Sequence, residues 1–426
     1  MSWVEKEEWK YFRYGGRHIL FEPIGKHRCS QGLLLRVRRR DARQFTSLEI
    51  EEEQRFIREF FGTILGLSYV PEAEVVSVST EFLCELSRSL RFLRNQTSQN
   101  SFKFPAEDID VDCFSHSVIV IRDQRKLSLP ATTTSEDCVC VEWKPKYMLL
   151  PRSRLIPVPI SKYKYRYYRC NLKYSQLESS LDYNPEDIFS FQYERIRRAL
   201  VSLLRQNSKY LQLLYPCELE PSSSTILDSK LDVLVHIICK EAVLFTNIRM
   251  IQQLDVLDYE GVKIALETLE ILDETDLEQL EKKIYRRTFS PHWLKEELLY
   301  LASHDDIIFH SDEEEKRMHW CLTGDIRKLE ESFLRGQSCL RSLDRVELER
   351  LIGDFLYSTI MKDCSILINF VQVSENSEWN LSDIWKPLCI EQRMYYYCIS
   401  IIDLEPKSLK KLKIWLENDL FLFQFS

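Results

Sequence analysis

The chain has 426 residues, 44% of them hydrophobic and 29% charged, with a formal net charge of -8. This composition excludes fibrous, low-complexity and broadly disordered chains, and the length is enough for one large domain or two lobes that each bury a core. The acidic total argues against a dedicated nucleic-acid binder, which usually carries a broad basic face.

The first third of the chain is predicted to be mixed α/β. A polar, threonine-rich stretch at 122–135 follows it and makes a plausible hinge. The pattern favours two strands joined by a turn over 11–21, further strands over 33–37, 74–79 and 118–121, and helices over 50–61 and 81–92.

Helical patterns dominate beyond this hinge. We expect a strand over 138–143, a mostly extended stretch over 151–168, helices over 194–204, 262–284 and 346–359, and two late β segments over 364–370 and 395–402. This order predicts an α+β fold, and by analogy at the level of fold it resembles the layout of a two-lobed kinase. The β-rich N-lobe would occupy 1–124 and the larger, helix-rich C-lobe 125–426, in a protein that we expect to be a monomer.

The cysteines, the N-terminus and the most apolar segment indicate the cellular compartment in which such a chain is expected to function. The 13 cysteines form an odd, scattered set without a CxxC pair, so we expect a reducing compartment, the nucleus and/or the cytoplasm, rather than a disulfide framework. The N-terminus is acidic and polar, unlike a signal peptide. Charged residues interrupt the apolar segment 231–245, which is therefore expected to form a buried helix and not a membrane span.

Two features near the N-terminus are candidates for binding nucleotide phosphates. Phosphoryl transfer needs backbone amides or cations over the phosphates, carboxylates for Mg²⁺ and a group that orients the attacking hydroxyl. Gly15-Gly16 lies between two strand patterns and can form a turn that covers phosphates, and Arg36 on the next strand can supply a cation. An ordinary hairpin turn is the commoner role of a glycine pair in isolation, and an exposed strand arginine is equally compatible.

Two lysines flank a proline where the predicted strand 138–143 ends, in the sequence EWKPK of residues 142–146. In extended geometry, residues two apart face the same side, so Lys144 and Lys146 can reach one anion together. Proline restricts the local conformation. A solvated strand end is the alternative interpretation.

Two aspartates adjoin the late β segments. Asp363 precedes the first segment and Asp403 follows the second. Carboxylates at strand ends are where metals and substrates collect in α/β proteins, although aspartate also caps many turns. Lys407 and Lys411 would place cations near Asp403.

The segment 162–169 alternates basic and aromatic residues, KYKYRYYR. Stacking of single-stranded nucleic acid on these aromatics is one interpretation. We favour an extended strand that packs its tyrosines inward and points Lys162, Lys164 and Arg166 toward solvent or an anion, because the total charge is acidic.

Taken in order along the chain, these segments resemble the inositol-pentakisphosphate 2-kinase family. Residues 142–146 are similar to that family's E-[IL]-K-P-K signature, residues 362–365 are identical to its K-D-C-S signature, and residues 401–407 are similar to a third signature around an aspartate. The resemblance spans roughly Glu8 to Trp415. Supporting similarities lie at Glu8-Trp9, Gly15-Gly16, Arg36, Tyr69-Val70, 183–190, Gln206-Asn207 and 254–261.

The resemblance implies a kinase that uses ATP and Mg²⁺ to phosphorylate the 2-hydroxyl of inositol 1,3,4,5,6-pentakisphosphate, giving inositol hexakisphosphate (phytate). Asp363 would orient that hydroxyl and accept its proton, and Lys144 would stabilise the phosphoryl group in flight. Asp403 and Asp363 would hold Mg²⁺. The implied nucleotide-phosphate contacts are Gly15, Gly16, Arg36 and Asp403. The implied inositol phosphate ligands are Lys146, Lys173, Asn207, Lys407, Lys411 and, more loosely, Arg40.

The chain departs from the family pattern at the glycine loop. The family loop resembles G-x-G-G-A-N, whereas residues 13–18 read RYGGRH and lack one glycine and the asparagine. The alternative function is therefore a catalytically impaired scaffold that binds inositol polyphosphates. RNA binding through 162–169 is a third and less favoured possibility. The Cys/His cluster that some plant members use for zinc is absent from the sequence, so we expect no zinc.

Overall fold

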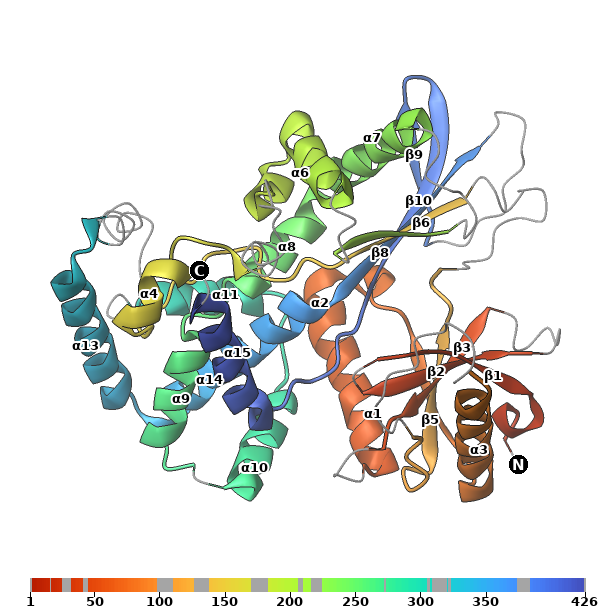
Figure 1. The fold of residues 1–426 in the computed structure, drawn as a ribbon, viewed down its shortest axis with the longest axis horizontal. Helices are drawn as coiled ribbons and strands as arrows, with labels where there is room; N and C mark the ends of the chain where they lie inside the picture. The colour runs from red at the N-terminus through yellow and green to blue at the C-terminus, as the bar shows by residue number, and fades with distance from the viewer. Residues whose placement is uncertain are drawn as a thin grey trace. The chain divides into compact units, whose positions relative to one another are not determined.

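The chain divides into two compact units, which are described separately. Unit 1 comprises Met1–Arg58 and Val70–Thr133, and unit 2 comprises Glu59–Tyr69 and Thr134–Ser426. Figure 1 shows the elements of both units. The computed structural model describes residues 2–15, 17–24, 32–40, 45–97, 110–125, 138–169, 183–205, 210–215, 224–271, 273–304, 307–308, 320, 323–373 and 384–424.

Unit 1 is built on a five-stranded antiparallel sheet with the strand order β1-β2-β3-β5-β4. The strands agree with the predicted strand positions in this part of the chain. They are β1 (Trp9–Tyr14), β2 (His18–Pro23), β3 (Leu33–Arg38), β4 (Ala73–Ser77) and β5 (Ser117–Arg122).

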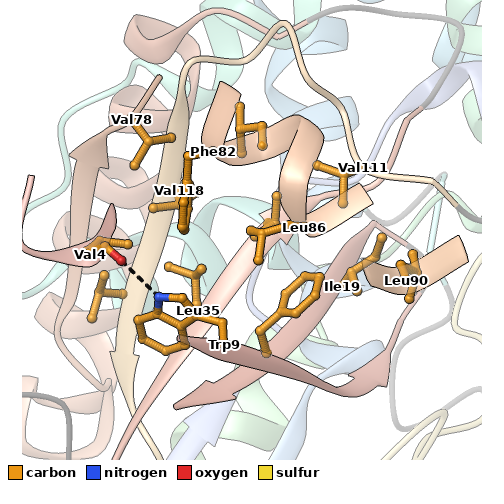
Figure 2. Close-up of a cluster of buried hydrophobic side chains, with 14 residues drawn as sticks. Val4, Trp9, Ile19, Leu35, Val78, Phe82, Leu86, Leu90, Val111 and Val118 are labelled. Carbon is orange, nitrogen blue, oxygen red and sulfur yellow. Dashed lines mark hydrogen bonds between the residues drawn. The ribbon is translucent and has the colours of Figure 1, made fainter. Parts of the chain in front are cut away.

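The core of unit 1 forms between this sheet and helix α3 (Thr80–Thr97). The apolar face of α3, which includes Phe82 and Leu86, packs against buried strand residues such as Ile19 and Leu35 (Figure 2). The buried indole of Trp9 donates a hydrogen bond of 2.9 Å to the carbonyl oxygen of Val4, which ties the N-terminal 3-10 turn η1 (Val4–Lys6) to the sheet.

A second predicted helix carries the chain out of unit 1. Helix α1 (Ser47–Phe56) begins at a capping box on Thr46 and continues as a π-helical turn over Ile57–Phe61. The end of this helical stretch belongs to unit 2, because Phe60 packs there against Phe289 and Tyr357, with ring centroids 4.5 Å from each. The chain returns to unit 1 after short helix α2 (Gly62–Leu65) and turn η3 (Leu67–Tyr69).

Unit 2 contains a second five-stranded antiparallel sheet, with the order β7-β6-β8-β10-β9. Two of its central strands, β6 (Cys138–Trp143) and β8 (Ser365–Val373), are almost entirely buried, as their mostly apolar sequences predict. The strands are β6 (Cys138–Trp143), β7 (Leu211–Tyr215), β8 (Ser365–Val373), β9 (Lys386–Ile390) and β10 (Arg393–Ile402).

Helix α14 (Arg345–Asp363) is the central helix of unit 2 and leads directly into β8. Its residues from Leu351 to Lys362 are all buried, because helices α8, α9 and α10 pack around it. The helices of unit 2 besides α14 include α6 (Tyr193–Arg205), α7 (Ser224–Lys240), α8 (Ala242–Gln252), α9 (Asp258–Thr268), α10 (Glu274–Tyr285), α11 (Trp293–Ala302), α13 (Ile326–Ser342) and α15 (Leu412–Gln424). Within the described residues, none of the helices combines the length and the apolar character that a membrane crossing requires. With its two antiparallel sheets and many helices, the chain has the predicted α+β, two-lobed fold.

The prediction of one long helix over 262–284 is wrong. Helix α9 ends at Thr268 and α10 begins at Glu274. Between them Glu270 has a left-handed backbone (φ 55°), and the side chain of Asp273 accepts a hydrogen bond from the amide of Asp276 as the N-cap of α10. The apolar periodicity runs through this break, which is why the pattern alone did not reveal it.

The prediction of an extended strand over 162–169 is also wrong. Helix α4 (Val158–Lys164) occupies the first part of this segment, with a proline in its first turn. Lys164 is only 1% exposed, and its ammonium group lies 2.7 Å from Asp419, 2.8 Å from Glu260 and 3.1 Å from Asp258. Arg169 bonds Asp258 and Asp419 as well. These five residues form a buried ion cluster in unit 2, so Lys164 neither faces an external anion nor presents a stacking surface.

Candidate active site

The sheet of unit 2 brings three predicted site segments to one edge. Strands β6 and β10 both pair antiparallel with β8, with Trp143 opposite Ile366 and Ile402 opposite Ser365. The end of β6, the start of β8 and the end of β10 therefore meet. The residues that continue from these ends are Lys144 and Lys146, Asp363, and Asp403 and Lys407.

Asp363 is the centre of this arrangement. It is the last residue of α14, and its side chain is 51% exposed. One carboxylate oxygen accepts a hydrogen bond from Lys146, and the other lies 2.5 Å from the ammonium nitrogen of Lys407. Burial raises the pKa of Asp363, but the charges and hydrogen bonds of Lys407 and Lys146 outweigh it and lower the pKa to about 2. Asp363 is therefore a stable carboxylate flanked by two cations.

Asp403 is joined to the same place through Ser365. The hydroxyl of Ser365 lies 3.2 Å from Oδ2 of Asp403 and 2.8 Å from Oε1 of Glu142. Lys144 completes the set, with its ammonium nitrogen 3.3 Å from the same oxygen of Glu142. We call these seven residues the Asp363 site: Glu142, Lys144, Lys146, Asp363, Ser365, Asp403 and Lys407.

Two residues of the Asp363 site have left-handed backbones, Lys146 with φ 49° and Asp403 with φ 62°. This conformation costs roughly 1 to 2 kcal/mol for a residue with a side chain, although aspartate tolerates it better than lysine. Such strain persists only where the surrounding structure imposes it, and it is concentrated at functional sites. The turn at Lys146 also explains why the two lysines of EWKPK do not act as a pair in this structure: Lys144 bonds Glu142, whereas Lys146 bonds Asp363.

The carboxylates of the Asp363 site fit a magnesium ion that shares its ligands with a phosphate. Mg²⁺ is usually held by one or two carboxylates, with water and substrate phosphates as the remaining ligands. Asp403 uses one oxygen for Ser365, and the described residues offer no partner for its other oxygen. Within the described ranges no three His, Cys, Asp or Glu side chains are grouped closely enough to hold a metal by themselves. Asp403 is thus the residue best suited to this ion, with Asp363 as its neighbour.

The remaining predicted residues are distributed over both units. In unit 1, the amide of Gly15 donates a hydrogen bond of 2.8 Å to the carbonyl oxygen of His18, which closes the β1–β2 hairpin. Arg36 lies 3.3 Å from Nδ1 of buried His18. Burial, and then the charges of Arg36, Arg38 and Arg17, keep the pKa of His18 well below its usual value, so this imidazole is neutral. Exposed Arg40 is tied to unit 1 by a backbone hydrogen bond to Asp110.

In unit 2, Lys411 is exposed in the turn η6 (Leu409–Lys411) that precedes α15. Gly16, Lys173 and Asn207 lie outside the described residues.

Sequence reasoning missed the roles of Glu142 and Ser365. Both belong to the quoted signatures, EWKPK and KDCS, but neither stood out as a candidate because serine and a strand glutamate are common. The signal available in the sequence was the position of Glu142 in an otherwise apolar strand pattern, and the structure shows that Glu142 is 4% exposed and Ser365 1% exposed. A buried carboxylate needs a partner, which here is the pair formed by Ser365 and Lys144.

A small cavity lies beside the Asp363 site, and its lining does not include the residues of that site. Tyr147, Arg169, Gln252, Asp258 and Lys362 are among the residues that line it, and its volume is about 30 Å³.

Comparison with known proteins agrees with the resemblance seen in the motifs. The family model described as inositol-pentakisphosphate 2-kinase matches residues 11–420. A protein of Arabidopsis thaliana named inositol-pentakisphosphate 2-kinase is 23% identical over 390 residues, which cover 88% of this chain and 76% of the relative. A protein of the same name from Danio rerio is 27% identical over 224 residues, 49% of this chain and 43% of the relative.

A relative of the same name from Cryptococcus neoformans is 25% identical over 210 residues, which are 47% of each chain. The predicted family and the predicted enzyme class, a phosphate-transferring kinase, are thus confirmed. With almost its full length matched by one family model, this chain belongs to the inositol-pentakisphosphate 2-kinase family.

Proposed function

We propose that this chain transfers the terminal phosphoryl group of ATP to the 2-hydroxyl of inositol 1,3,4,5,6-pentakisphosphate and releases inositol hexakisphosphate. One observation carries the proposal: the carboxylate of Asp363 lies between the ammonium groups of Lys146 and Lys407, at the edge where Asp403 and Lys144 also lie. This combination of orienting carboxylate, metal-binding carboxylate and cations is the set that phosphoryl transfer requires.

In this proposal Asp363 orients the attacking hydroxyl. Its low pKa makes it a weak base, which suits a loose transition state in which the hydroxyl needs orientation more than early deprotonation. Lys146 and Lys407 would bind phosphates that flank the hydroxyl, and Lys144 would lie against the phosphoryl group as it moves. Lysine suits this role because its ammonium group is a compact charge that three phosphate oxygens can approach.

Asp403 would hold Mg²⁺, which supplies positive charge to the nucleotide phosphates when it is bound. Gly15, Gly16 and Arg36 remain the proposed nucleotide-phosphate contacts, and Lys173, Asn207, Lys411 and Arg40 the proposed further ligands of the inositol phosphate.

The experiment is transfer of ³²P from labelled ATP to a panel of inositol phosphates, with Mg²⁺ and with EDTA. We expect label on inositol pentakisphosphate, in the product that co-migrates with inositol hexakisphosphate, and none with EDTA. Folded protein that labels no member of the panel would refute the proposed activity. Label on a different inositol phosphate would keep the reaction and change the substrate.

A specific observation favours the second candidate, a scaffold that binds inositol polyphosphates without turnover. The amide of Gly15 is already used within its hairpin, so it does not point a free N–H at a phosphate. Titration calorimetry separates the candidates: a scaffold binds inositol hexakisphosphate but not ATP with Mg²⁺, whereas the kinase binds both.

We also propose that the protein is a monomer that works in the nucleus and/or the cytoplasm. Every cysteine in the described part of the chain is a free thiol, which supports a reducing compartment. Light scattering and fractionation of cells that express a tagged chain test these two points.

A further inference from the structure

The two lysines that bond Asp363 share a structural feature. Neither lies in a helix or a strand, so regular backbone hydrogen bonding does not fix its main chain. Each main chain is held instead by one side chain from the last residue of a helix: Gln252 ends α8 and Tyr285 ends α10.

Gln252 holds the segment around Lys146. Its side-chain nitrogen donates a hydrogen bond of 2.9 Å to the carbonyl oxygen of Lys146, and its side-chain oxygen accepts one of 3.2 Å from the amide of Met148. Gln252 is only 2% exposed, so water does not readily replace these bonds. The two bonds bracket the left-handed backbone of Lys146, whose strain would otherwise relax toward an ordinary conformation.

Tyr285 holds Lys407 in a similar way. Its hydroxyl donates a hydrogen bond of 2.7 Å to the carbonyl oxygen of Lys407 and accepts one of 3.0 Å from the amide of the same residue. One hydroxyl therefore satisfies both main-chain groups of Lys407. Glu281, one turn earlier in α10, fixes the following residues by accepting hydrogen bonds from the hydroxyl of Ser408 and the amide of Leu409.

We propose that Gln252 and Tyr285 are the positioning residues of the Asp363 site: they set where the ammonium groups of Lys146 and Lys407 lie relative to Asp363 and to the phosphates of the substrate. The part that concerns substrate phosphates rests on the proposed function, whereas the part that concerns Asp363 does not. Neither residue touches the reacting groups; both act through the main chain of a lysine.

The test uses variants that remove only the hydrogen bonds. Gln252→Met has nearly the same volume and no charge, and Tyr285→Phe lacks only the hydroxyl. Two substitutions elsewhere in unit 2 are matched controls, because each also exchanges one uncharged residue for another and removes a hydrogen bond to a main-chain carbonyl. Thr268→Ala removes a bond of 2.8 Å to the main-chain carbonyl of Ile264, and Tyr165→Phe removes a tyrosine–carbonyl bond of 2.6 Å to Ser153.

The first readout is the pKa of Asp363, which is measured from the ¹³C chemical shift of its carboxyl group as the pH is varied. This ¹³C signal is assigned as the one that is lost in Asp363→Asn. If the lysines move away, this pKa rises from about 2 toward its ordinary value. We expect a rise of about one unit in Gln252→Met and in Tyr285→Phe, and none in the controls. An unchanged pKa in a folded positioning variant overturns the proposal for that residue. Tyr285→Phe keeps the proposal testable if Gln252→Met does not fold.

The second readout is the affinity for inositol hexakisphosphate at fixed salt, measured by calorimetry. We expect a loss of roughly tenfold in each positioning variant, the effect of one misplaced charged hydrogen bond, and less than twofold in the controls. If the unmodified protein neither binds this probe nor transfers phosphate, the proposed function fails. The pKa readout then still decides whether the two residues position the lysines.

Discussion

Unit 2 contains two groups of lysines and carboxylates that differ in burial. In the buried ion cluster, Lys164 is 1% exposed and contacts three carboxylates. In the Asp363 site, Asp363 is half exposed and two lysines share one carboxylate. A charged group in the protein interior needs a permanent partner of opposite charge. A charged group that solvent can reach can exchange its protein partner for a charged group of a ligand. The first group is therefore structural, and the second can bind phosphates.

The two groups also differ in their backbones. In the Asp363 site the strained residues, Lys146 and Asp403, lie in irregular segments next to strand ends. In the buried ion cluster the one strained residue, Asp258, begins α9, where Asp255 accepts a hydrogen bond from its amide. A left-handed backbone alone therefore does not mark a functional site, because it also occurs at the start of a helix. In the Asp363 site it occurs together with exposed charges that can exchange their partners.

The largest expected effect separates the two groups through stability. Lys164→Met removes the cation that bonds Asp258, Glu260 and Asp419 in the interior and leaves Arg169 to bond only Asp258 and Asp419. We therefore expect a loss of about 3 to 5 kcal/mol in the free energy of unfolding. Lys146→Met is the matched variant at the exposed edge and should cost at most about 1 kcal/mol. Urea unfolding measures both. Equal losses in the two variants would remove the distinction between the groups.

Binding should show the reverse order. Lys407→Met removes a cation that we propose binds a substrate phosphate, and its affinity for inositol hexakisphosphate should fall by about ten- to a hundredfold in calorimetry. Lys410→Met is a useful control, because Lys410 is three residues away and bonds Glu274 and Glu278 instead of Asp363. A comparable loss in Lys410→Met would mean that the total charge of this segment, and not the position of Lys407, determines binding.

A smaller effect concerns the titration of Asp363. The pKa of about 2 lies below the ordinary value, so the ion pair stabilises the fold above about pH 4, and this contribution is lost as the pH falls through about 2. In Lys407→Met the pKa should rise by about two units, more than in Tyr285→Phe, because the cation itself is removed. The ¹³C shift of the carboxyl group should then change most steeply near pH 4 in the variant but not in the unmodified protein. Identical titrations would show that Lys407 does not hold this carboxylate.

The smallest expected effect concerns a buried carboxyl group that belongs to neither of the two groups. Asp354 in α14 is fully buried, and burial, followed by the nearby charge of Glu297, raises its pKa well above the usual value. The folded state thus retains a proton that the unfolded state loses, so stability falls as the pH rises above about 4. Asp354→Asn should remove this dependence and add about 1 kcal/mol to the free energy of unfolding at neutral pH. A loss of stability in urea unfolding would show that an ionised Asp354 is needed.

Much of the fold followed from periodicity, because several strands of both sheets, such as β5 and β6, are short, mostly apolar runs that begin or end beside polar segments. The errors arose where a local signal competed with that periodicity. Asp273 is an N-cap inside a continuous apolar pattern, and the alternation over 162–169 coincides with a helix that begins beside prolines. Lys164 looked like a surface charge because its three partners are about 90 to 250 residues away in the sequence.

The Asp363 site was predictable to the extent that its residues lie in recognisable signatures. Asp363, Asp403, Lys144, Lys146 and Lys407 were all named from the sequence, and their proximity follows from three adjacent strands whose pairing no local pattern specifies. Ser365, Glu142, Gln252 and Tyr285 were not identified, because their roles depend on hydrogen bonds between distant segments. Such contacts become visible only once the register of the sheet is known.

Replacement of one carboxylate tests the role of Asp363 most directly. Asp363→Asn keeps the size and the position of the side chain but lowers its ability to accept a proton and to attract the two lysines. In a rapid-quench measurement of ³²P transfer to inositol pentakisphosphate, we expect a loss of about 10² to 10⁴ in the rate, while calorimetry shows inositol hexakisphosphate still bound. Transfer by Asp363→Asn at the rate of the unmodified protein would contradict the assignment of this carboxylate to the attacking hydroxyl.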